Sequence, residues 1–104
     1  MHADLLKVRA ELTALCRRFQ VERLEVFGSA ARGTDFDPAR SDVDFLVTFA
    51  PEVRNDMTVY LNLKDALAAL VGRPVDLIER EAVEASPNYI RRRRILAEAE
   101  PLYG

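Results

Sequence analysis

The sequence predicts an α/β fold: one small mixed β-sheet with helices packed on it. Three short apolar stretches have the composition of strands. They alternate with longer stretches in which apolar residues recur every three or four positions, as on one face of a helix. The expected order is helix, strand, strand, helix, strand, helix, which is typical of a sheet covered by helices. A chain of 104 residues can bury one hydrophobic core, so we expect a single domain over residues 1–104.

Three helices are expected from the spacing of apolar residues, over residues 3–19, 57–71 and 87–99. The second is long enough for about four turns at 3.6 residues per turn. Each has local signals near its ends. The residues that give these signals are Asn55 or Asp56 as a cap, Gly72 and Pro74 as a stop, and Ser86 and Pro87 as a cap and first helical position.

Strands are expected over residues 22–27, 43–49 and 75–78, because β-branched and aromatic residues are prominent there. The second of these is nearly all apolar after Asp44, as in a strand that is covered on both faces, so we expect it to be central. Residues 33–41 contain glycine, proline and several polar side chains and are expected to be a loop.

Charge and composition exclude several classes of protein. The net charge of −2 does not suggest a protein that coats nucleic acid, and we expect no direct nucleic-acid binding. The lone Cys16 allows no internal disulfide and is expected to be buried filler. No apolar run approaches the ~18 residues of a membrane span and no signal peptide is visible, so we expect a cytoplasmic protein with no membrane partner.

Two aspartates, Asp42 and Asp44, stand at the start of the expected second strand. Since strand side chains alternate between faces, the two carboxylates are expected to project to the same face. At ~4 Å and an effective dielectric constant of about 20, their repulsion is about 4 kcal/mol. A divalent metal ion can relieve it. Arg32 or Arg40 can pair with Asp44 instead, and Asp42 alone also fits a turn cap.

A third acid, Asp76, favours the metal. Like Asp44, it is a single acid inside an apolar strand. If the third strand lies beside the second, the carboxylates of Asp42, Asp44 and Asp76 converge on one point. Carboxylate oxygens and substrate phosphates are ligands that Mg²⁺ prefers, and two ions can clamp the attacking and leaving oxygens of a phosphoryl transfer. The sequence therefore predicts a magnesium site for phosphoryl chemistry.

Gly28 and Ser29 end the expected first strand. A glycine lets a ligand approach the backbone closely, and the hydroxyl of Ser29 with the N–H groups of the following turn can face phosphate oxygens. By themselves the two residues fit an ordinary turn equally well.

Four consecutive arginines occupy positions 91–94 of the last expected helix. At ~100° per residue they spread around the helix, so a solvated surface is the simplest interpretation. The residues expected to face inward are Tyr89, Leu96 and Ala99. Arg92 or Arg93 falls on the same stripe, where it can reach nucleotide phosphates, an acid at the edge of the core or an acidic partner. Leu102 and Tyr103 are expected to anchor the tail.

Taken together, Gly28-Ser29, Asp42-Val43-Asp44 and Asp76 resemble the nucleotidyltransferase superfamily that is related to DNA polymerase β. The size resembles its smallest branch, the minimal nucleotidyltransferases (MNT), which includes the MntA-like antitoxins of HEPN/MNT toxin–antitoxin systems. The stretches that match are residues 26–34, 41–47, 74–78 and 95–103. The chain departs from the family between Ser29 and Asp42, where its loop of twelve residues is longer than in most members.

The resemblance implies transfer of AMP from ATP to a tyrosine hydroxyl of a partner HEPN ribonuclease toxin, which silences the toxin. By the same resemblance, Gly28 and Ser29 would hold the triphosphate, and Asp42 and Asp44 would bind two Mg²⁺ ions. Asp76 would bind the catalytic ion and help to deprotonate the attacking hydroxyl.

Two other functions stay open. The domain can be a binding module that neutralises its partner sterically, without catalysis. It can also transfer a nucleotidyl group to RNA or to a small molecule, although the negative net charge disfavours RNA.

Overall fold

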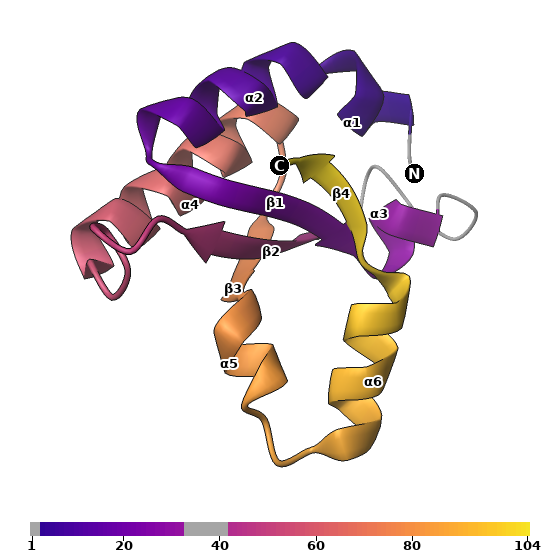
Figure 1. The fold of residues 1–104 in the computed structure, drawn as a ribbon. Helices are drawn as coiled ribbons and strands as arrows, with labels where there is room; N and C mark the ends of the chain where they lie inside the picture. The colour runs from indigo at the N-terminus through magenta and orange to yellow at the C-terminus, as the bar shows by residue number, and fades with distance from the viewer. Residues whose placement is uncertain (1–2, 33–41) are drawn as a thin grey trace.

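A four-stranded mixed sheet in the order β3-β2-β1-β4 organises the computed structural model, which describes residues 3–32 and 42–104 (Figure 1). Its strands are β1 (Val21–Phe27), β2 (Val43–Phe49), β3 (Val75–Glu79) and β4 (Glu100–Tyr103). β1 is antiparallel to both β2 and β4, whereas β2 and β3 are parallel. The predicted mixed sheet is confirmed, and so is an inner position for the strand over 43–49. The expected loop over 33–41 lies outside the described residues.

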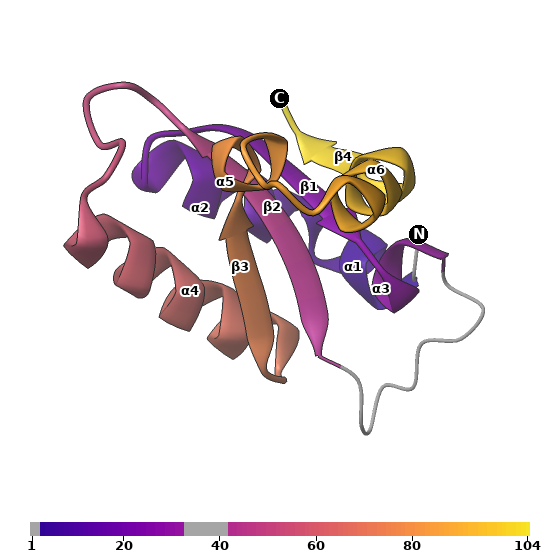
Figure 2. The ribbon, with the colours of Figure 1, turned by 90° about the horizontal axis from the view of Figure 1, so that it is seen from below.

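Helices cover both faces of this sheet. They are α1 (Ala3–Lys7), α2 (Arg9–Arg18), α3 (Ser29–Arg32), α4 (Met57–Val71), α5 (Arg80–Glu84) and α6 (Tyr89–Glu98). Figure 1 shows α1, α2 and α4 on one side of the sheet and α5 and α6 on the other. Two buried clusters follow this division: a large one beneath α1, α2 and α4, and a smaller one of Phe27, Leu46, Val83 and Ile95 beneath α5 and α6. The view in Figure 2 shows α5 and α6 in front of the strands.

The helix expected over residues 3–19 is interrupted at Val8, which separates α1 from α2. Val8 has φ −105° and ψ 15°, outside the helical region. Leu5 and Leu12, on the two sides of the break, are both buried in the large cluster. A break of one residue preserves the spacing of apolar positions on either side, so the pattern could not reveal it.

The helix over residues 57–71 is confirmed as α4, and its ends have the expected chemistry. Of the two residues that fit a cap, the structure selects Asp56, whose Oδ1 accepts hydrogen bonds from the N–H groups of Thr58 and Val59 at 3.0 and 3.2 Å. Gly72 ends the helix with φ +72°, a left-handed conformation that glycine adopts at little cost.

The last helix begins later than expected, at Tyr89 rather than Pro87. Its cap is Asn88, whose Oδ1 accepts a hydrogen bond from the Arg91 N–H at 3.1 Å. Ser86, the expected cap, instead accepts from the Asn88 N–H at 3.2 Å and closes the preceding turn. Ser86 and Asn88 can both cap a helix at this point, and in the structure Asn88 caps α6.

The tail is anchored as expected, but by a strand that the sequence did not predict. β4 pairs with β1, with Leu24 opposite Tyr103, and Leu102 is buried in the large cluster. The short helices α3 and α5 were also not predicted, because four or five residues show no helical period. In the described part of the chain, no helix has the length and apolar character needed to cross a membrane.

Candidate active site

Asp44 and Asp76 lie side by side at one end of the sheet. Each is the second residue of its strand, and β2 and β3 pair in parallel with Asp44 opposite Asp76. Residues that face each other in a parallel pair project to the same side of the sheet, about 4.8 Å apart across the strands. Asp44 is half-buried, and Asp76 is exposed. Asp44 is also opposite Phe27, the last residue of β1, so the pair adjoins the end of that strand.

Gly28 follows Phe27 in the chain, and the Asp44 side chain fills the space next to it. Gly28 has φ +72°, and a Cβ placed on it would lie 2.6 Å from the Asp44 Oδ2 atom. Both features disfavour a side chain, because this φ is unfavourable for other residues and the carboxylate in its present position fills the space. The sequence suggested that this glycine lets a ligand approach the backbone. The structure shows that Asp44 itself makes the close approach.

Ser29 and Asp42 lie near this pair but do not line the same cavity. Ser29 begins α3 and is half-buried, and Asp42 is exposed and precedes the first residue of β2. Of the three carboxylates expected to converge, two therefore line this cavity. Within residues 3–32 and 42–104, no group of three or more His, Cys, Asp or Glu side chains is arranged to hold a metal ion.

A cavity of about 570 Å³ opens over the two aspartates. One wall is formed by the sheet and the other by α6 and its cap. Its polar groups are carboxylates on the sheet side and two guanidiniums, an amide and a carboxylate on the helix side. The lining residues are Phe27, Gly28, Asp44, Asp76, Asn88, Ile90, Arg91, Arg94, Ile95 and Glu98. A site of this composition can hold a ligand that carries both cations and anionic groups.

The arginines that reach this cavity are Arg91 and Arg94, not Arg92 or Arg93 as the sequence suggested. Arg92 is half-buried and donates a hydrogen bond to the Ser86 carbonyl at 2.9 Å. Of the three residues expected to face inward, Tyr89 is 57% exposed, so this part of the expectation is wrong. The expected inward positions of Leu96 and Ala99 are confirmed: both pack on the smaller cluster, whose α6 member is Ile95.

The chemistry of the donor set fits a divalent cation. Mg²⁺ is commonly held by one or two protein carboxylates together with substrate phosphates, so it does not need a cage made by the protein alone. Asp44 and Asp76 supply two such carboxylates in register on adjacent strands. The absence of a side chain at Gly28 leaves room for the Asp44 carboxylate close to the backbone.

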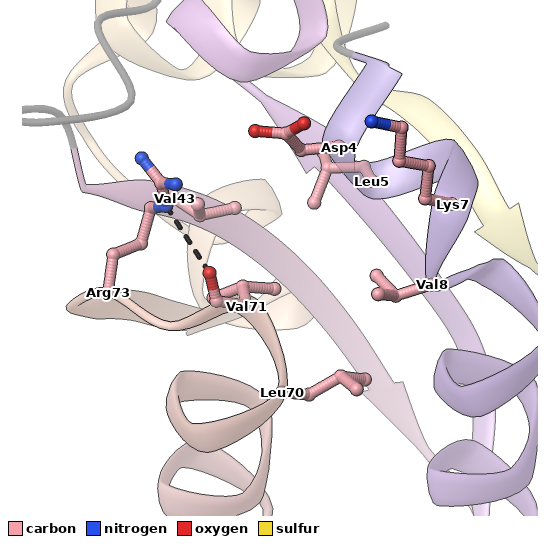
Figure 3. Close-up of a pocket in the computed structure, with 8 residues that line it drawn as sticks. All are labelled: Asp4, Leu5, Lys7, Val8, Val43, Leu70, Val71 and Arg73. Carbon is pink, nitrogen blue, oxygen red and sulfur yellow. Dashed lines mark hydrogen bonds between the residues drawn. The ribbon is translucent and has the colours of Figure 1, made fainter.

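A second cavity, of about 230 Å³, lies on the face of the sheet covered by α1 and α4 (Figure 3). Its walls are largely apolar, and Asp4, Lys7 and Arg73 stand around them. The Arg73 Nε–H donates to the Val71 carbonyl at 3.4 Å. This cavity has no pair of carboxylates on its wall, so it lacks the donor set of the first one.

A buried ion pair supports the helical wall of the site and was not found from the sequence. Glu25, in the middle of β1, is 2% exposed, and both of its carboxylate oxygens accept hydrogen bonds from Arg80 Nη1, at 2.6 and 2.8 Å. Arg23 Nε lies 3.3 Å from the same carboxylate. Arg80 is the first residue of α5, which packs against α6. The pair therefore ties the α5–α6 unit to the central strands.

The chain belongs to the nucleotidyltransferase family: the model of the nucleotidyltransferase domain matches residues 8–99. The fold and the enzyme class expected from the sequence are confirmed by this match and by the mixed sheet with its covering helices.

Three known proteins resemble this chain. A candidate minimal nucleotidyltransferase of known structure is 33% identical, covers 97% of this chain and 96% of its own, and superposes with a TM-score of 0.73. A candidate protein adenylyltransferase of Methanocaldococcus jannaschii is 32% identical over 66 residues, which span 64% of each chain. The third is the structure of a tri-AMPylated Shewanella oneidensis HEPN toxin in complex with its MNT antitoxin. It has a chain with a TM-score of 0.62 at 18% identity, over 95% of this chain and 71% of that one. At that identity the likeness is one of fold.

Proposed function

We propose that this chain transfers AMP from ATP, with Mg²⁺, to a tyrosine hydroxyl of a partner HEPN-domain toxin, and that the transfer silences the toxin. The observation that carries the proposal is the pair Asp44 and Asp76, which face each other in register across β2 and β3 on the wall of one cavity. Family membership supports the reaction class. The names of the relatives support AMP as the group transferred and a HEPN toxin as the acceptor. A reaction that consumes ATP fits the cytoplasm.

In this proposal Asp44 and Asp76 hold the divalent cation, and Asp42 contributes to a second ion from its position before β2. When bound, the cations supply positive charge that offsets the charge of the phosphates. Gly28 leaves room for the Asp44 carboxylate, and Ser29, at the start of α3, faces the triphosphate with its hydroxyl.

The chemical step is a substitution at the α-phosphorus of ATP. A bond forms between the acceptor oxygen and the α-phosphorus, and the bond between that phosphorus and the bridging oxygen of the β-phosphate breaks, which releases pyrophosphate. The proton of the acceptor hydroxyl passes to the Asp76 carboxylate, which is exposed at the cavity and so accessible to a group from a partner. Most of the rate enhancement is expected from positioning and charge neutralisation.

The test is transfer of label from [α-³²P]ATP to the purified HEPN partner in the presence of Mg²⁺. Wild type is expected to label the toxin and to abolish its ribonuclease activity, and Asp44→Asn and Asp76→Asn are each expected to lose labelling by at least about 10²-fold. Asp65→Asn, an exposed aspartate on α4, removes the same charge away from the cavity and should behave as wild type. Labelling by Asp42→Asn measures how much the third carboxylate contributes to the transfer.

Other outcomes assign the remaining functions. If no label reaches the toxin and Asp44→Asn still neutralises it, the chain acts sterically and the proposal is wrong. If label appears instead on RNA or on a small molecule in a screen of acceptors, the reaction class stands and the proposed partner is wrong.

A further inference from the structure

The four arginines of α6 divide into two pairs with different surroundings. Arg91 and Arg94 are three residues apart, lie on the same face of the helix and both line the cavity above the aspartates. Arg92 and Arg93 do not line that cavity, and both instead contact Tyr89. The Arg92 guanidinium lies 5.5 Å from the centre of the Tyr89 ring, and Arg93 Nη1 donates to the Tyr89 hydroxyl at 3.3 Å.

The two guanidiniums at the cavity are weakly held by the protein itself. Among the residues that the structure describes, the Arg91 side chain has no hydrogen bond or ion pair with another residue. Arg94 Nε lies 3.6 Å from Glu98 Oε1, and the Arg94 side chain is 71% exposed. Because the Arg94 side of this pair is open to solvent, the pair contributes little, and Arg94 can exchange it for a stronger partner.

A nucleoside triphosphate needs positive charge on more than one side. Asp44 and Asp76 would hold a cation on the sheet side of the cavity, and groups on α6 would supply positive charge from the other side. Guanidinium groups match phosphate oxygens with two parallel hydrogen bonds, and such charge-assisted bonds are the strongest that a side chain forms with an anion. Arg91 and Arg94 face the cavity from the side opposite the aspartates.

We infer that Arg91 and Arg94 bind the β- and γ-phosphates of the nucleotide and retain the pyrophosphate as it leaves. The inference rests on the proposed function for the identity of the ligand, a nucleoside triphosphate. It assigns to two of the four arginines a role in holding the anionic part of the substrate. The other two have other partners: Arg92 donates to the Ser86 carbonyl and Arg93 to the Tyr89 hydroxyl.

The test measures equilibrium binding to the full chain by isothermal titration calorimetry, without any acceptor. The probes are ATP with Mg²⁺, inorganic tripolyphosphate with Mg²⁺, and AMP. Arg91→Ala and Arg94→Ala are each expected to weaken ATP and tripolyphosphate binding by about tenfold, the effect of one charge-assisted hydrogen bond. AMP binding should change less than about twofold, because AMP lacks the β- and γ-phosphates.

Two further variants make the result specific. Arg93→Ala removes the same charge from the same helix, away from the cavity, and is expected to leave all three affinities unchanged. Arg91→Lys keeps the charge but loses the two parallel hydrogen bonds of a guanidinium. Its affinity for ATP and tripolyphosphate should lie between those of wild type and Arg91→Ala.

Four results would overturn the inference. If Arg93→Ala weakened ATP binding as much as Arg91→Ala, the effect would be a general one of charge. If Arg91→Ala weakened AMP and ATP binding equally, the arginines would not contact the β- and γ-phosphates. Unchanged ATP binding by Arg91→Ala, with slower transfer to the toxin, would assign the arginines to an acidic surface of the acceptor. Because no acceptor is present, failure of transfer to the HEPN toxin leaves the binding result intact. A wild type that binds neither ATP nor tripolyphosphate overturns the inference whatever the acceptor assay shows.

Discussion

Two glycines of this chain offer a controlled test of how the site is held. Gly28 and Gly72 both have φ +72°, so an alanine at either position meets the same backbone strain, about 1–2 kcal/mol. Their surroundings differ: a Cβ at position 72 has nothing within 4 Å, whereas at position 28 it would lie 2.6 Å from Asp44 Oδ2. The pair therefore separates the effect on the backbone from the effect on the carboxylate.

The expected loss of activity in Gly28→Ala follows from the 2.6 Å distance between the added Cβ and Asp44 Oδ2. Ordinary contact begins at 3.4 Å, so Gly28→Ala must push the Asp44 carboxylate away by about 0.8 Å. The carboxylate is the end of a side chain and can turn, so the added cost in stability is small. A displacement of nearly 1 Å in a group that positions a reaction can lower the rate by about 10²-fold.

The assay combines urea unfolding with the rate of adenylyl transfer. Both alanine variants are expected to lose about 1–2 kcal/mol of unfolding free energy, and only Gly28→Ala is expected to lose about 10²-fold in rate. The reasoning would be refuted if Gly28→Ala kept a transfer rate within about threefold of Gly72→Ala. It would also be refuted if Gly28→Ala were far less stable, because the backbone rather than the carboxylate would then have moved.

Three further predictions concern the scaffold. Arg80→Ala leaves Glu25 buried with only the exposed Arg23 beside it, and urea unfolding should show a loss of about 3 kcal/mol. Replacing Glu25 and Arg80 together by methionine should cost much less, and an equal loss would contradict the ion-pair argument. Asp56→Ala should cost about 1 kcal/mol, because the N–H groups at the start of α4 lose their acceptor, and no change in the urea midpoint would contradict this role of the cap. Burial raises the pKa of the Cys16 thiol from 9.0 to about 11, so only the unfolded chain ionises between these values. Stability should therefore fall by up to about 2.7 kcal/mol as pH rises from 9 to 11, a dependence that Cys16→Ala should lack and whose persistence in that variant would contradict the assignment.

The strands and the long helix could be predicted because their signals are local. β2 shows a run of apolar residues, and α4 has a helical period with a cap at Asp56 and a stop at Gly72. β4 could not be predicted in this way. Its four residues, Glu100–Tyr103, include a proline and have little strand character, and they are ordered by pairing with β1, which lies more than 70 residues earlier in the chain.

The candidate site also depends on contacts that local sequence patterns do not show. An acid with an apolar residue on either side of it in a strand occurs at Glu25, Asp44 and Asp76. Only the fold separates them, because Glu25 pairs with Arg80, 55 residues further on, while Asp44 and Asp76 meet at the cavity. The pattern identifies acids that lie within strands, and the partner of each one depends on contacts between distant segments.

The contribution of α6 to the site was also beyond the sequence. The four arginines could be placed on a helix, but which two face the cavity depends on how the helix packs against the sheet. In the structure α6 buries Ile95, and the arginines that then line the cavity are Arg91 and Arg94. The sequence offers several apolar positions on this helix, and only the contact with the strands selects Ile95 among them.

The most direct test of the central claim is the binding of Mn²⁺, as a substitute for Mg²⁺, in the presence of a non-hydrolysable ATP analogue, measured by electron paramagnetic resonance. Wild type is expected to bind Mn²⁺ tightly only with the nucleotide. Asp44→Asn and Asp76→Asn should each lose most of that binding, and the double variant should be little worse than either. Retention of wild-type Mn²⁺ affinity by Asp76→Asn would contradict the claim that the two carboxylates act as one site.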